Sequence, residues 1–69
     1  MLAQVKPEKG KYLVQVYRTE SNTEHKTWQT IAETEDQGLA IRLREFCRYE
    51  NHDSEIDTMR AYYLSTHNK

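Results

Sequence analysis

The side chains best suited to chemistry are three histidines, one cysteine and a group of acidic residues. His25, His52 and His67 are far apart, and no HxH, HxxxH or HExxH spacing places two of them on one face of an element. With only one distant cysteine, they predict solvated side chains in loops and in the C-terminal tail. We therefore expect no metal site.

The single cysteine, Cys47, has the sequence position of a packing residue. It falls on the apolar stripe of an expected helix, where a free cysteine behaves as a small hydrophobe. It also lies near the C-terminal end of that helix, which does not stabilise a thiolate. Because one cysteine cannot form an internal disulfide, we expect a reducing, cytoplasmic setting.

Nothing else in the sequence has the spacing of a catalytic or cofactor site. The acidic residues between 50 and 57 lack the glycine and the closing glutamate of a calcium loop. Gly10 and Gly38 are the only glycines, so no phosphate-binding loop is encoded. A domain this small also buries only about 60% of its unfolded surface, which leaves no room for a deep cleft. We expect a non-enzymatic protein without a cofactor.

The composition indicates one small domain over residues 1–69 with a thin core. Leu, Ile, Val and Phe account for 12 of the 69 residues, and five Tyr and one Trp add apolar area. Ten Lys and Arg face 11 Asp and Glu, for a formal charge of −1. No apolar run has the length of a secretion signal or of a membrane span. We expect no membrane contact.

Two strands and a connecting loop are predicted in the first half of the chain. Residues 11–18 and 27–32 are rich in β-branched and aromatic residues, and the polar segment between them has a plausible turn centre at Ser21-Asn22. Side chains alternate along a strand, so the first strand has one face with Tyr12, Val14 and Val16. Its other face carries Leu13, Gln15 and Tyr17.

A helix is predicted after these strands. Thr34 and Gln37 have the spacing of a capping box, in which each side chain bonds the backbone amide of the other residue. The helix is expected to end near Asn51, which tolerates the left-handed conformation. Its apolar stripe, which should face the core, consists of Leu39, Ala40, Leu43, Phe46 and Cys47.

The C-terminal region can be read in two ways. Residues 58–64 predict a third strand, because a lone hairpin is marginal and a third strand completes a sheet. Helix propensity and the spacing of Met59, Tyr62 and Tyr63 allow a helix instead. With the strand, the fold class is α+β, a small three-stranded antiparallel or mixed sheet covered on one face by a single helix in the order β-β-α-β. Residues 1–10 and 65–69 are then flexible ends.

One helix cannot cover both faces of a three-stranded sheet, so one face should stay open with aromatic side chains on it. The sequence leaves undecided which face this is. We expect a small accessory or regulatory module that binds a second copy of itself, as a homodimer, or another protein, since aromatic residues dominate such interfaces. The predicted interaction face consists of Leu13, Gln15, Tyr17, Trp28, Arg60 and Tyr62.

Single-stranded nucleic acid is the alternative partner. Exposed tyrosines and a tryptophan can stack on bases, and Arg18, Lys26 and Arg60 can contact phosphates. The sequence pI of about 6.3 counts against this alternative, because affinity for nucleic acid depends on clustered cations. Protein binding is therefore the favoured expectation.

Overall fold

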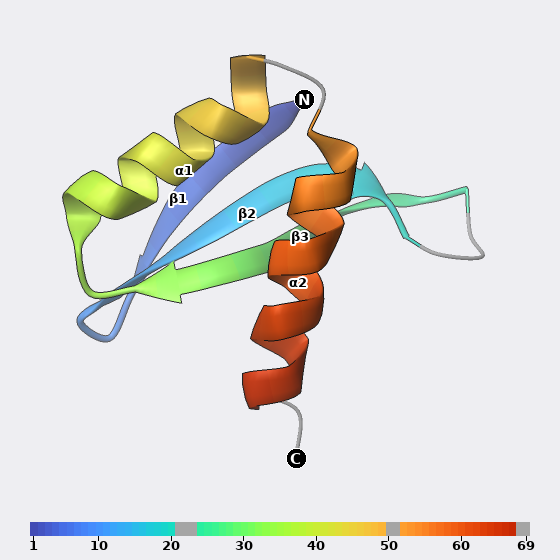
Figure 1. Cartoon of the computed structure of the whole chain (residues 1–69). Coiled ribbons are helices and arrows are strands. Elements are labelled where there is room, and N and C mark those ends of the chain that lie inside the picture. The colour runs from blue at the N-terminus through green and yellow to red at the C-terminus, as the bar shows by residue number, and fades with distance from the viewer. Residues whose placement is uncertain (21–23, 50–51, 68–69) are drawn as a thin grey trace.

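The computed structural model describes residues 1–20, 24–49 and 52–67, so the predicted turn centre at Ser21-Asn22 and the predicted helix end at Asn51 lie outside the described residues. Three strands are followed by two helices (Figure 1). They are β1 (Leu2–Glu8), β2 (Lys11–Thr19), β3 (Lys26–Thr34), α1 (Gln37–Tyr49) and α2 (Asp53–His67). The α+β class is confirmed, but the single helix and the β-β-α-β order are wrong.

The sheet is antiparallel with the order β1-β2-β3, and its third strand comes from the N-terminus. The prediction of a flexible segment at residues 1–10 is therefore wrong. β1 pairs with β2 from Leu2↔Tyr17 to Glu8↔Lys11, and Pro7 is tolerated because β1 is an edge strand. Lys9 and Gly10 join the two strands with φ of 48° and 81°. Two positive φ values suit a two-residue hairpin turn whose twist matches the strands.

The C-terminal segment is a helix, so the strand predicted at residues 58–64 is wrong and the competing helical reading is right. α2 starts with Asp53 and Glu55 in its first turn, where acidic side chains suit the helix dipole. It continues to His67, so residues 65–67 are helical and not part of a flexible tail. Because β1 completes the sheet, the C-terminal segment is free to cover it.

Both helices pack on one face of the sheet. α1 lies over β1 and β2, while α2 crosses β3 and its C-terminal half extends past that strand (Figure 1). A β-bulge in β3 leaves Ile31 without a partner between Thr30↔Gln15 and Ala32↔Val14, and both Ile31 and Ala32 pack into the core. The buried core consists of Ala3, Val14, Val16, Ile31, Ala40, Cys47 and Ile56.

α1 begins two residues later than a Thr34 cap would require. The Asp36 carboxylate accepts from the Leu39 amide at 3.2 Å, and the Asp36 carbonyl accepts from the Ala40 amide at 3.0 Å, so Asp36 is the N-cap. The Thr34 hydroxyl accepts instead from the Asp36 amide at 3.1 Å. The predicted capping box is therefore wrong, because the acidic side chain takes the capping role.

The apolar stripe of α1 is narrower than predicted. Ala40 and Cys47 are buried and Leu43 is half-buried against the core. Leu39 and Phe46 lie at the sides of this line and are exposed. Because small side chains lie at the centre of the contact, α1 can approach the sheet closely.

Candidate functional site

The face of the sheet opposite the helices has no other helix or strand packed over it among the described residues, and α2 reaches it at one corner, where His67 contacts Glu33. Cross-strand partners share a face, so the pairing register arranges the side chains of this open face in rows across the strands. We name three of them. The aromatic row is Leu2, Tyr17 and Trp28, the amide row is Gln4, Gln15 and Thr30, and the charged row is Lys6, Leu13 and Glu33.

The aromatic row is the most exposed apolar feature of this face. The exposed fractions are 65% for Leu2, 36% for Tyr17 and 42% for Trp28. The Tyr17 and Trp28 rings pack against each other with centroids 5.2 Å apart and planes at 47°. Such tilted ring pairs are favourable beyond the area they bury. The contact between the two rings fixes their positions, and all three side chains of the row remain accessible to solvent.

The amide row is a chain of hydrogen bonds across all three strands. Gln4 Nε2 donates to Gln15 Oε1 at 2.7 Å, and Gln15 Nε2 donates to Thr30 Oγ1 at 3.0 Å. Gln15 is only 9% exposed, since its hydrogen-bonded neighbours Gln4 and Thr30 flank it on the adjacent strands. Polar groups that are already hydrogen-bonded to one another have a smaller desolvation cost when a partner covers them.

The charged row ends in a carboxylate that two other side chains contact. Lys11 Nζ lies 2.6 Å from Glu33 Oε1, and His67 Nε2 contacts Glu33 Oε2. The hydrogen bond from Lys11 lowers the pKa of Glu33 below its ordinary value, and the same bond raises the pKa of Lys11. Glu33 is therefore held in its charged form at the outer strand of the open face. At the other end of the row, Lys6 is exposed.

Both edges of the sheet are capped by arginines from the helices. Arg48 of α1 donates to the carbonyl oxygen of Ala3 on β1, and Arg60 of α2 donates to that of Thr30 on β3. Free backbone groups on an edge strand are a template for pairing with another chain. The arginines occupy one such acceptor on each edge, which leaves the open face as the larger unpartnered surface of the sheet.

Four of the six residues predicted for an interaction face share this open face, namely Leu13, Gln15, Tyr17 and Trp28. Arg60 and Tyr62 do not, because they belong to α2. Arg60 bonds the edge of β3, whereas Tyr62 is 72% exposed beside a groove. The sequence analysis missed Leu2, Gln4 and Lys6 of β1, which also lie on this face. Their alternation with Ala3 and Val5 is the sequence signal that could have identified β1 as a strand.

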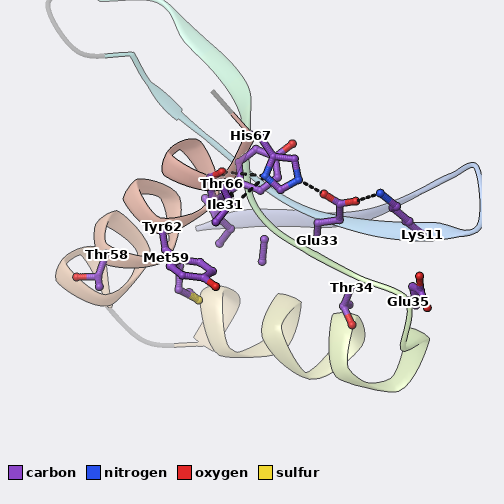
Figure 2. Close-up of a pocket in the computed structure, with 12 residues that line it drawn as sticks. Lys11, Ile31, Glu33, Thr34, Glu35, Thr58, Met59, Tyr62, Thr66 and His67 are labelled. Atoms are coloured by element: carbon purple, nitrogen blue, oxygen red, sulfur yellow. Dashed lines mark hydrogen bonds and ion pairs between the residues drawn. The ribbon is translucent and has the colours of Figure 1, made fainter. Parts of the chain in front are cut away.

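The groove beside Tyr62 lies between β3 and α2 and has a volume of about 680 Å³ (Figure 2). Ile31, Ala32 and Met59 contribute apolar surface to it, and Lys11, Glu33 and His67 form its polar end. Its size is in the range of small-molecule sites. Both Glu33 oxygens already have partners, so this polar end is occupied by the protein itself.

The polar end superficially has the order of a hydroxyl, a base and an acid. Thr66 Oγ1 lies 2.8 Å from His67 Nδ1, and His67 Nε2 contacts Glu33. His67 Nδ1 also lies 2.9 Å from the Tyr63 carbonyl, to which the Thr66 hydroxyl donates at 2.9 Å. Which of these atoms donates to Nδ1 or accepts from it depends on the tautomer of His67. Together with the contact to Glu33, these bonds connect the last turn of α2 to the end of β3.

The remaining candidate residues have structural surroundings. Cys47 is buried, as predicted, and burial raises the pKa of its thiol. His52 is half-buried and stacks on Phe46 with ring centroids 3.8 Å apart, and His67 stacks on Tyr63 at 4.1 Å. His52 lies in the loop before α2 but is less solvated than predicted, and His67 is exposed but belongs to α2 rather than to a tail.

Within the described ranges, no three His, Cys, Asp or Glu side chains gather closely enough to hold a metal ion. Neither α1 nor α2 has the length and apolar character needed to cross a membrane. Comparison with protein-family models, with curated proteins and with solved structures finds no match to this chain.

Proposed function

We propose that this chain is a non-enzymatic interaction module, of an accessory or regulatory kind, whose open sheet face binds the same face of a second copy. The observation that carries the proposal is the aromatic row. Its two rings and Leu2 lie exposed on the face of the sheet opposite the helices. Covering about 400 Å² of such surface contributes about 10 kcal/mol before the cost of association, comparable to the net stability of a small domain.

Two further features favour this face over the sheet edges. The amide row has two internal hydrogen bonds, so a partner that covers it leaves fewer polar groups unpaired than three separate polar side chains would. The edge carbonyls of Ala3 and Thr30 already accept from Arg48 and Arg60, which disfavours the addition of a strand. Face-to-face packing is therefore the mode of association that we propose.

Trp28 provides a direct test because it is the only tryptophan of the chain and lies in the proposed interface. Sedimentation across a concentration series should show a dimer, and Trp28 emission should shift to shorter wavelength over the same range. Trp28→Ser should weaken the dimer at least tenfold, since buried aromatic anchors dominate interfaces. Tyr49→Ser is the matched control, because Tyr49 is exposed on α1. A monomer at high micromolar concentration would exclude the proposal.

Single-stranded nucleic acid is the second candidate, and the lysines of the open face favour it. Lys6, Lys11 and Lys26 share that face with the two rings, although Lys11 is paired with Glu33. The arginines named for this role are engaged on the helix side, Arg18 with Asp57 and Arg60 with Thr30. A thymidine oligonucleotide that quenches Trp28 at low salt, and is released as salt rises, would favour this candidate.

A further inference from the structure

The register of the open face also determines how two copies would fit, an inference that rests on the proposed function. Two identical faces in contact are related by a two-fold axis lying between the two sheets. Aligned sheets pack about 10 Å apart with strand directions within about 30°. The axis can run along the strands or across them, and these two directions bring different side chains into contact.

An axis along β2 keeps each row opposite the same row of the partner and exchanges β1 with β3. Leu2 would then lie over Trp28 of the second copy, and the two Tyr17 rings would face each other across the axis. In the amide row, Gln4 would lie over Thr30. Apolar side chains meet apolar side chains, and polar side chains meet polar ones.

The charged row is the strongest argument for this direction. Lys6 on β1 and Glu33 on β3 are the two ends of that row, on either side of Leu13. Exchange of β1 with β3 places Lys6 of one copy over Glu33 of the other, twice per dimer. Lys6 would there join Lys11 and His67 of the other copy, which already contact this carboxylate and leave its side chain 15% exposed. Next to the charged row, the two Lys11 side chains of β2 approach each other across the axis. Each forms an ion pair with Glu33 of its own chain, which offsets the repulsion between them.

An axis across the strands gives poorer contacts. If it passes through the amide row, the aromatic row covers the charged row and Trp28 lies over Glu33. If it passes through the aromatic row, most of the open face lies outside the contact. Burial of a charge against an apolar ring without a partner is costly. We propose that the second copy docks with its two-fold axis along β2, and that reciprocal Lys6–Glu33 ion pairs set its orientation.

Charge reversal tests this arrangement. Lys6→Glu and Glu33→Lys should each weaken self-association on the order of tenfold, because each places two like-charged pairs in the interface. An equimolar mixture of the two variants should form a heterodimer, since one interface pair then joins the two substituted positions with opposite charges and the other is the wild-type Lys6–Glu33 pair. Native mass spectrometry with one variant labelled with ¹⁵N identifies the mixed species. Melting curves of both variants verify that they are folded.

Lys26→Glu is the matched control. Lys26 lies on the same face, beside Thr19, where the proposed axis brings no carboxylate opposite to it. Glu33→Lys should therefore not rescue Lys26→Glu. If the wild type dimerises and Lys6→Glu with Glu33→Lys gives no preferred heterodimer, the axis is wrong although the proposed function stands. If the wild type stays monomeric at high micromolar concentration, both fail.

Discussion

The guanidinium of Arg48 on α1 donates two hydrogen bonds to the carbonyl oxygen of Ala3 on β1, from Nε at 3.3 Å and from Nη2 at 3.0 Å. The other edge has a counterpart, since Arg60 Nη1 donates to the Thr30 carbonyl at 3.0 Å. Each helix therefore both covers the sheet and occupies one acceptor on an edge strand. A strand that adds to either edge competes with one of these side chains for its carbonyl acceptor.

Removal of either arginine should expose an edge and promote aggregation. We expect Arg48→Gln and Arg60→Gln to form thioflavin-binding aggregates faster than the wild type at equal concentration, because a free edge is a template for pairing. Arg42→Gln has the same charge change on the exposed side of α1 and is the control. If all three variants aggregate at the same rate, the edge contacts do not protect the sheet.

The largest fully buried side chain that the helices contribute to the core is Ile56 of α2, outside the apolar stripe of α1 that the sequence predicts. Ile56 is fully buried, so Ile56→Ala should cost about 2–5 kcal/mol in the free energy of unfolding, enough to unfold much of so small a domain. Leu43 is only half-buried, and Leu43→Ala should cost less. Urea unfolding of both variants and of Ile41→Ala, an exposed control, compares them. An equal loss in all three would contradict this ranking.

The elements with a strong local pattern were predictable, and those that depend on distant partners were not. The strands at residues 11–18 and 27–32 and a helix near residue 37 follow from alternation and helical periodicity. The third strand was assigned to the wrong terminus, because β1 contains Pro7 and its turn is Lys9-Gly10 rather than Asn-Gly. Only the pairing of β1 with β2 shows that the segment is a strand.

The candidate site was predictable in part for the same reason. Alternation along β2 placed Leu13, Gln15 and Tyr17 on one face, and the structure adds that this face is the open one. The bulge at Ile31 and the pairing of β1 with β2 depend on tertiary packing. The sequence therefore could not predict that Lys6 and Glu33 lie in the same row. Arg60 was misplaced because its segment was read as a strand.

The assignment of Asp36 as the N-cap of α1 can be tested by substitution. Asp36→Ala should reduce the free energy of unfolding by about 1 kcal/mol, because the Leu39 amide loses its side-chain acceptor. Thr34→Val should have a smaller effect, since the Thr34 hydroxyl accepts only from the Asp36 amide outside the helix. Thermal melts compare the two variants. A larger loss for Thr34→Val would restore the capping box predicted from the sequence.

The Lys11–Glu33 ion pair makes a pH-dependent contribution to stability with a defined sign. The hydrogen bond from Lys11 lowers the pKa of Glu33 in the folded state, so its contribution is present above the ordinary value of 4.5 and is lost as the pH falls through the lowered pKa. The bond to Glu33 raises the pKa of Lys11, so its contribution is present below the ordinary value of 10.5 and is lost as the pH rises through the raised pKa.

The pair should therefore stabilise the fold over the whole neutral range and lose its effect at both extremes. We expect the difference in unfolding free energy between the wild type and Glu33→Gln to stay constant from mildly acidic to mildly alkaline pH. Below the ordinary pKa of Glu33, and above that of Lys11, the difference should shrink. Urea unfolding at dilutions that keep the chain monomeric separates this effect from association. A difference that changes mainly near neutrality would contradict this assignment to the Lys11–Glu33 pair.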